Sequence, residues 1–226
     1  MCGRFSLTTT NDEMRKRFGV VLTQNLRPRW NIAPTHETLI LKSDGLSVLP
    51  SMASFGFVPR QQTKMIINAR SETISEKPSF SSHLESRRCL VIASGWYEWT
   101  TDKKPYHVQL ADGRVMAMAG LYRPAQRNQP EQFVVVTTAA DGNLAEIHHR
   151  SPAVLPQTAW SGWLSAPVHE ALKLLSPPPA HYFNFYPVSS AVGRVSNDYP
   201  ELVAPLTTSE EEAEKHGQAG QADLFR

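Results

Sequence analysis

The second residue of the chain is a cysteine whose position could give it two nucleophilic groups. Initiator methionine is commonly removed when the next side chain is small, and loss of Met1 would leave Cys2 with a free α-amine. The amine titrates at about pH 8 and the thiol at about pH 8.5, so both are partly nucleophilic at neutral pH. The amine could condense with an aldehyde, and the thiol could then close a thiazolidine ring intramolecularly. The other cysteine, Cys89, opens an apolar stretch and is expected in the core.

Two further segments carry polar side chains beside apolar or aromatic ones. Residues 66–72, Ile-Ile-Asn-Ala-Arg-Ser-Glu, run from an apolar stretch into polar positions that begin at Asn68. Residues 94–99, Ser-Gly-Trp-Tyr-Glu-Trp, place Glu98 among three aromatic residues. Desolvation there would raise the pKa of the Glu98 carboxyl towards the range of an acid–base catalyst.

A third segment, residues 146–152, contains the adjacent histidines His148 and His149. No third ligand stands at a metal-binding spacing, so we expect no metal site and no cofactor. Each candidate residue also has a structural interpretation when it is taken alone. Asn68 could cap a turn or helix, Glu98 could be an exposed strand residue, and His148 could be an ordinary surface or core histidine.

The elements that must position these residues are mainly short strands. A capping box at Thr10 and Glu13, with apolar residues at Met14, Phe18 and Leu22, predicts one helix near the N-terminus. Turn signals predict two hairpins, 38–49 through Ser-Asp-Gly and 106–121 through Asp-Gly. Further strands are predicted at 65–68, 88–94, 96–99, 133–138 and 183–188, and short helices at 79–86, 143–147, 158–164 and 168–175. The irregular spacing predicts an α+β domain with a largely antiparallel, barrel-like β-sheet core and short peripheral helices.

Composition and charge narrow the function classes. The 226 residues are 41% hydrophobic and 19% charged, as in ordinary globular proteins, and we expect one folded domain over 1–206 and a polar, flexible tail over 207–226. Two cysteines cannot form a disulfide framework, and neither a signal peptide nor a membrane span is evident, so we expect a cytoplasmic monomer that does not contact membranes. Residues 1–70 hold ten Lys/Arg against four Asp/Glu, which favours a polyanionic partner such as nucleic acid.

Eight segments, taken in order, resemble the SRAP (SOS response-associated peptidase) family. They cover almost the whole predicted domain, and their number makes the resemblance specific. The segments are Met-Cys-Gly-Arg-Phe at 1–5, Asn-Ile-Ala-Pro-Thr at 31–35, Phe-Gly-Phe-Val-Pro at 55–59, Asn-Ala-Arg-Ser-Glu at 68–72, Gly-Trp-Tyr-Glu-Trp at 95–99, Val-Thr-Thr-Ala-Ala at 136–140, Ile-His-His-Arg at 147–150 and Tyr-Pro-Val-Ser at 186–189.

The resemblance implies the SRAP fold and a sensor of abasic sites in single-stranded DNA. After Met1 is removed, either by the protein itself or by ordinary processing of initiator methionine, Cys2 would form a thiazolidine crosslink with the ring-opened sugar aldehyde and so shield the site from strand cleavage. By the same resemblance Glu98 would act as acid and base, His148 would shuttle protons at the sugar oxygen, and Asn68 would orient the N-terminus and the lesion. The DNA-binding residues implied are Arg4, Pro34, Arg70, Thr137 and Arg150.

Two positions depart from the family pattern. Arg-Gln-Gln at 60–62 stands where many relatives carry a tryptophan-bearing wedge, which changes how a duplex next to the lesion would be met. His149 replaces an aspartate that usually follows the family's histidine, and without that carboxylate the pKa of His148 is expected to be lower than in relatives.

The tail ends in Gln-Ala-Asp-Leu-Phe at 221–225, which resembles the short peptide by which bacterial replication proteins bind the sliding clamp. Leu224 and Phe225 would fill an apolar pocket, Gln221 would bind at its rim, and residues 207–220 would be the tether. Such a contact would place the protein at replication forks; chance composition is the alternative.

Two other functions remain open from the residues. One is a cysteine peptidase that uses Cys2 with His148 and Asn68 on its own N-terminus or on other proteins. The other is a binder of single-stranded DNA without covalent chemistry. Substitution of Cys2 separates these alternatives from the crosslinking function.

Overall fold

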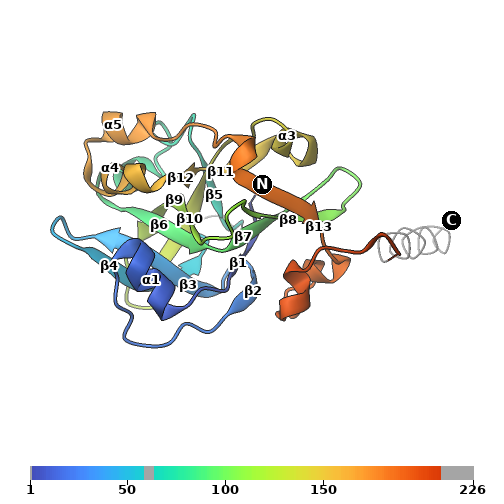
Figure 1. Ribbon diagram of the computed structural model, residues 1–226. Coiled ribbons are helices and arrows are strands. Elements are labelled where there is room, and N and C mark those ends of the chain that lie inside the picture. The colour runs from blue at the N-terminus through green and yellow to red at the C-terminus, as the bar shows by residue number, and fades with distance from the viewer. Residues whose placement is uncertain (1, 59–63, 210–226) are drawn as a thin grey trace.

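A closed ring of five strands forms the centre of the molecule. Figure 1 shows the computed structural model, which describes residues 2–58 and 64–209. The ring runs in the order β10, β4, β3, β6, β9 and returns to β10. All of its contacts are antiparallel except the parallel pair of β4 and β10. The strands are β3 (Glu37–Ser43), β4 (Val48–Phe55), β6 (Arg88–Ala93), β9 (Met116–Arg123) and β10 (Gln132–Ala139).

Three short strands extend this ring at β9 and β10. β5 (Asn68–Arg70) runs parallel to β10, with Asn68 opposite Val135. β11 (Arg150–Pro152) runs antiparallel to β10, and β12 (Val154–Leu155) antiparallel to β9. The segments around Asn68 and Arg150, far apart in sequence, therefore meet along β10.

A second sheet lies against the ring and carries the N-terminus. Its order is β13 (Phe183–Pro187), β8 (Pro105–Leu110), β7 (Gly95–Trp99), β1 (Arg4–Leu7) and β2 (Arg29–Ile32). Every neighbouring pair is antiparallel. The Phe5 ring of β1 packs on Phe55 of β4, with centroids 5.4 Å apart, and on Phe133 of β10 at 6.4 Å. This buried aromatic cluster fixes the start of the chain to the ring.

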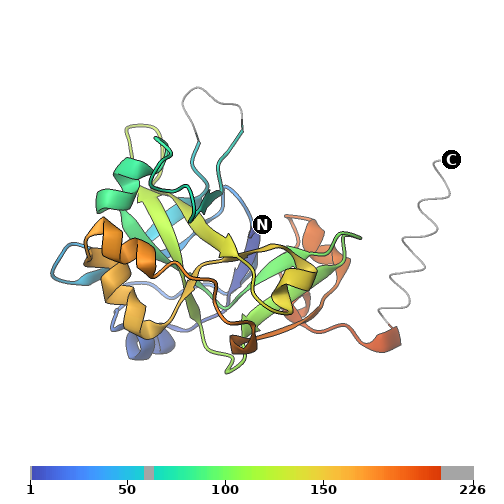
Figure 2. The same ribbon diagram turned by 90° about the horizontal axis from the view of Figure 1, so that it is seen from above.

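Short helices surround the sheets. α2 (Ser81–Ser86), α4 (Trp160–Ser165) and α5 (Val168–Lys173) gather on one side of the molecule, where α2 and α4 contact β6 (Figure 2). α1 (Asn11–Phe18) reaches α4 at its C-terminal end, where the Phe18 ring stacks on Trp160 with centroids 4.5 Å apart. α3 is Leu144–Ile147, and 3-10 turns cover Gln157–Ala159, Ala180–Tyr182, Ser190–Gly193 and Pro200–Val203. The α+β, largely antiparallel and barrel-like architecture expected from the sequence is confirmed. No helix among the described residues is long and apolar enough to cross a membrane.

Some local predictions hold and others are wrong. The predicted hairpin over 38–49 is β3 and β4, but the one over 106–121 does not form. Its strands, β8 and β9, belong to different sheets, because β9 is buried on both sides between β6 and β10 while β8 pairs with β7 and β13. The N-terminal helix has its predicted cap, since Glu13 N donates to Thr10 Oγ1, but it ends at Gly19 with φ 70°, before Leu22.

Candidate functional site

Pairing of β1 with β7 brings the N-terminus to Glu98. Arg4 lies opposite Tyr97 in this antiparallel ladder, so the residues before Arg4 run alongside Glu98. Cys2 is fully buried and Glu98 is 4% exposed. Burial raises the pKa of the Cys2 thiol far above its usual value, and the nearby Glu98 charge adds to that shift. Burial also raises the pKa of Glu98, so this carboxyl holds a proton to higher pH than an exposed one.

His148 also lies beside Glu98, at the C-terminal end of α3. Its Nδ1 is 3.7 Å from Glu98 Oε1. The backbone N–H of Arg150 donates to the same nitrogen at 3.0 Å, which a neutral ring protonated at Nε2 can accept. Burial lowers the pKa of His148, and the positive charges of the amino terminus and of Arg150 also disfavour the imidazolium. The site therefore places an imidazole whose pKa is lowered beside a carboxyl group whose pKa is raised.

Asn68 opens β5, and its side-chain amide is buried. Neither Oδ1 nor Nδ2 has a hydrogen-bond partner among the described residues. A buried amide without partners is costly, by about 1–3 kcal/mol for each group, and usually indicates a position that a ligand or substrate completes. The Asn68 Nδ2 can therefore donate a hydrogen bond to a bound molecule, and Oδ1 can accept one.

The guanidinium of Arg150 is held by the turn that follows β5 and by β10 of the ring. Its Nη1 donates to Glu72 Oε1 at 2.5 Å and its Nη2 to Glu72 Oε2 at 3.0 Å. Nη2 also donates to the carbonyl of Thr137 at 2.6 Å and lies 3.2 Å from its hydroxyl. Thr137 is fully buried and Arg150 is 8% exposed, so both side chains shape the wall behind His148.

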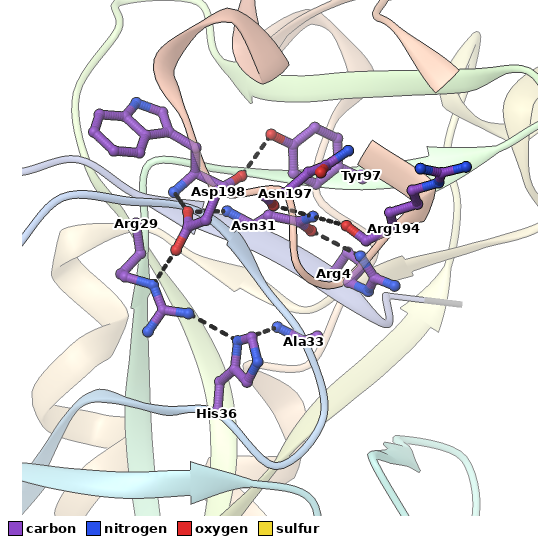
Figure 3. A network of polar contacts seen from close by, with 10 residues as sticks. Arg4, Arg29, Asn31, Ala33, His36, Tyr97, Arg194, Asn197 and Asp198 are labelled. Carbon is purple, nitrogen blue, oxygen red and sulfur yellow. Dashed lines mark hydrogen bonds and ion pairs between the residues drawn. The ribbon is translucent and has the colours of Figure 1, made fainter. Parts of the chain in front are cut away.

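Arg4 is also engaged within the protein. Its Nη1 donates to Asn31 Oδ1 and to the carbonyl of Val192, each at 2.8 Å, and its Nη2 to the carbonyl of Gly193 at 3.2 Å. Figure 3 shows Arg4 at one end of this polar network. The contacts fix the direction in which β1 approaches the site.

The rest of the network fastens the C-terminal part of the domain to β2. The Asn31 amide donates to the carbonyls of Val192, Arg194 and Asn197. Asp198 accepts the backbone N–H groups of Trp30 at 2.6 Å and Asn31 at 3.0 Å, and it pairs with Arg29. These bonds join residues more than 160 positions apart in the sequence.

Two remaining predicted DNA-binding residues lie outside this network. Arg70 ends β5 and is exposed. Pro34 is half-buried and precedes Thr35, which has a positive φ of 78° and whose backbone N–H donates to the carbonyl of Phe55. Of the predicted DNA-binding set, Arg70 is thus the exposed cation.

Sequence reasoning missed the supporting residues Glu72 and Asp198. Glu72 stands in the segment 68–72 that carried the resemblance, four positions after Asn68, and that proximity was the available signal. Asp198 gave no signal, because its partners in β2 lie about 168 positions earlier. The tail residues Gln221, Leu224 and Phe225, and the segment 60–62, lie outside the described residues.

Among residues 2–58 and 64–209 no group of three or more His, Cys, Asp or Glu side chains is arranged to hold a metal ion. The side chains considered at the site supply a thiol, a carboxyl, an imidazole and an amide, from Cys2, Glu98, His148 and Asn68. Such a set can add to a carbonyl carbon and move protons.

Comparison with known proteins gives the site its context. A Bacillus subtilis protein, abasic site processing protein YoqW, is 32% identical over 223 residues, which cover 90% of this chain and 99% of its own. The Escherichia coli abasic site processing protein YedK is 32% identical, covering 91% and 100%. Abasic site processing protein HMCES of Gallus gallus is 31% identical over 62% of this chain and 50% of its own.

Structural comparison agrees with these matches at the level of the fold. A crystal structure of a Bacteroides thetaiotaomicron protein superposes with a TM-score of 0.76 at 22% identity, covering 91% of this chain and all of that one. The family model described as SOS response associated peptidase (SRAP) matches residues 1–195. The chain belongs to the SRAP family.

Proposed function

We propose that this protein processes abasic sites by forming a covalent crosslink between Cys2 and the sugar of the lesion in single-stranded DNA. The observation that carries the proposal is the meeting of Cys2, Glu98 and His148, with 3.7 Å between His148 Nδ1 and Glu98 Oε1. The names of relatives that are about 30% identical over most of the chain support the abasic site as substrate. Arg70 and the basic segment 1–70 suit a polyanionic strand.

The first step is removal of Met1. While Met1 is attached, the Cys2 nitrogen belongs to a peptide bond and is not nucleophilic. Hydrolysis of that bond, which consumes one water, frees the α-amine. The short distance between His148 Nδ1 and Glu98 Oε1 supports a role for His148 as base and Glu98 as acid in this step within the chain itself.

The crosslinking steps then release one water. The ring-opened sugar presents an aldehyde at C1′, and the Cys2 amine adds to it to give a carbinolamine. A proton from Glu98 allows the hydroxyl to leave as water, which forms the Schiff base. The Cys2 sulfur adds to the same carbon, its proton passes to the nitrogen through Glu98, and the thiazolidine closes. His148 exchanges a proton with the sugar oxygen as the ring opens, and the Asn68 amide binds the lesion.

Intact-protein mass spectrometry after mixing with an oligonucleotide that holds one abasic site tests the proposal. Met1-free protein should gain the mass of the oligonucleotide minus one water, and Cys2→Ala should gain nothing. Cys89→Ala, which removes a thiol buried in the ring, is the matched control and should still crosslink. Absence of an adduct on Met1-free protein would contradict the proposal. Cleavage of peptides without DNA would then favour the peptidase, and strand binding that tolerates Cys2→Ala would favour the non-covalent binder.

The C-terminal segment carries a second, separate proposal. Gln-Ala-Asp-Leu-Phe at 221–225 suits a sliding-clamp contact that would deliver the protein to replicating DNA. Deletion of 221–226 should abolish capture by the immobilised clamp and leave crosslinking of a free oligonucleotide unchanged. Capture that persists in the deletion variant, or in a Leu224→Ala and Phe225→Ala double variant, would contradict this proposal.

A further inference from the structure

His149 forms the outer layer of a two-ring stack at the candidate site. Its imidazole lies on that of His148, with ring centroids 4.3 Å apart and planes inclined by 28°. His149 is exposed, whereas His148 is half-buried against Glu98. Since one face of the His149 ring is covered by His148, its exposure comes from the opposite face and the edge.

The backbone holds this pair in place. The carbonyl of His149 accepts the N–H of Ala140, and the N–H of His148 donates to the carbonyl of Leu144, both at 3.1 Å. The Arg150 N–H fixes the inner ring at Nδ1. An exposed aromatic face that is rigidly backed in this way loses little conformational freedom when it binds a ligand.

The charge around His149 suits an uncharged aromatic contact beside a phosphate. The positive charge that His148 can carry, followed by desolvation, lowers the pKa of His149, so both rings are neutral at pH 7. Arg70 of β5 is close enough to influence His149 electrostatically, and it is exposed. The rim of the site thus offers a flat neutral ring near an exposed cation.

An abasic nucleotide creates a matching need. It has no base, so the neighbouring base in the strand has lost its stacking partner on one side. Base–aromatic stacking contributes about 1–3 kcal/mol per base and does not depend on base identity. We propose that the exposed face of His149 stacks on the nucleobase next to the lesion while Arg70 binds the adjacent phosphate. This inference rests on the proposed function, because it assumes a lesion-bearing strand at Cys2.

A strand that cannot react tests the stack apart from the chemistry. The oligonucleotide carries a tetrahydrofuran in place of the abasic sugar, which removes the aldehyde, and 2-aminopurine at either neighbouring position. Binding to the wild-type protein should quench 2-aminopurine at one of the two positions. His149→Ala should abolish that quenching and weaken binding about 5- to 100-fold, equally at low and high salt. His149→Phe should restore both.

Two controls separate the stack from other effects. Arg70→Ala should instead weaken binding mostly at low salt, because it removes a phosphate contact. His169→Ala, an exposed histidine on α5, should change nothing. Unchanged quenching and affinity in His149→Ala would overturn the stacking role while leaving crosslinking by the wild-type protein intact. The opposite pair of results is also distinguishable. If the wild-type protein never crosslinks a reactive abasic strand, but the His149→Ala variant loses the quenching that the wild type shows, the proposed function is refuted and the stacking role is retained.

Discussion

Glu98 combines burial with proximity to a thiol and an imidazole. Burial raises its pKa, so the protonated form persists at higher pH than that of an exposed carboxyl. A carboxyl whose pKa is raised in this way is better suited to protonate a leaving hydroxyl than an exposed one. The same burial keeps the Cys2 thiol protonated, which makes a proton acceptor necessary when sulfur attacks.

Glu98→Gln should therefore slow crosslinking by roughly 100-fold or more, since the amide can neither give nor take the proton. In the wild-type protein the rate constant should fall at high pH, as Glu98 loses its proton above its raised pKa, and the variant should lack this descending limb. Crosslinking rates measured by gel shift from pH 5 to 9 check both points. Glu85→Gln, on an exposed side chain of α2, should match the wild type.

The residue types at the site could be predicted from the sequence, and their supports could not. Cys2, Asn68, Glu98 and His148 each stand in a short segment whose composition is unusual for plain packing. The structure brings Cys2, Glu98 and His148 together through strand pairing, which local patterns only imply. Arg150 is held by Glu72 across 78 positions, and no local pattern encodes that contact.

At the scale of elements, an ion pair joins the turn after β5 to the first residue of β11, which follows the two histidines. Glu72 follows β5 and binds both ends of the Arg150 guanidinium, whose own N–H orients His148. This salt bridge lowers the pKa of Glu72, mainly through the hydrogen bonds from Arg150. Glu72 is a positioning residue, because it acts on His148 only through Arg150.

Glu72→Ala should lower the free energy of unfolding by about 1–2 kcal/mol, because it removes the acceptor of Arg150 Nη1 and leaves Nη2 with Thr137 alone. The maximum crosslinking rate should fall as well, since His148 loses its fixed orientation. Glu72→Gln keeps one acceptor oxygen, so its unfolding free energy and its crosslinking rate should lie between those of the wild type and of Glu72→Ala. Urea unfolding and single-turnover crosslinking measure these effects, and equal values for Glu72→Ala and the exposed control Glu76→Ala would contradict the role.

A buried histidine of the second sheet contacts side chains of β1 and β13 through its two ring nitrogens. His107 of β8 is 2% exposed, with Nε2 3.1 Å from Ser6 Oγ and Nδ1 3.2 Å from the Tyr186 hydroxyl. Burial lowers its pKa to about 4. Because an unfolded histidine titrates at about 6.5, the unfolded state takes up the proton first. The folded state therefore loses stability as the pH falls from about 6.5 to 4.

His107→Gln should flatten this pH dependence. Across that interval the wild-type protein should lose about 3 kcal/mol of unfolding free energy more than the variant, because the glutamine does not titrate. Urea denaturation at several pH values from 7 to 4 gives the two curves. Parallel curves would show that His107 titrates normally in the folded protein.

Sequence patterns identified most elements but not their partners. The hairpin over 38–49 was predicted correctly, since its turn and its pairing are both local. The hairpin over 106–121 was wrong although its turn residues are suitable, with Gly113 at a φ of 69°. Continuous burial of β9, from Met116 to Leu121, required neighbours on both sides, and a hairpin supplies one.

For the whole molecule, closure of the five-stranded ring depends on Gly120. This residue of β9 lies opposite Cys89 of β6 and Val135 of β10, where the ring closes. A Cβ there would be 2.7 Å from a methyl carbon of Val91 and 2.9 Å from the Cys89 sulfur. Neither neighbour can move freely, because both are fully buried.

Gly120→Ala should accordingly destabilise the protein by about 1–3 kcal/mol through overpacking. Gly193→Ala is the matched control, since a Cβ at Gly193 meets no atom within 4 Å and its φ is not positive. Thermal unfolding of the two variants should show a lower Tm for Gly120→Ala alone. An unchanged Tm would mean that the ring expands to admit a methyl group.

The hydrogen bonds from the Arg4 guanidinium to the carbonyls of Val192 and Gly193 have a consequence for protein synthesis. A ribosome makes Arg4 first and its partners 188 residues later, which takes about 10–40 s at bacterial and eukaryotic elongation rates. During that interval the nascent chain already has its cysteine, and β1 can pair with β2 and β7 as they are made, but the Arg4 guanidinium still lacks its two carbonyl acceptors. The 3-10 turn Ser190–Gly193, translated near the end of the domain, supplies them. The alignment of the first strand is therefore completed only when the domain is nearly finished, and a chain truncated before this turn would carry its cysteine on a less firmly held strand.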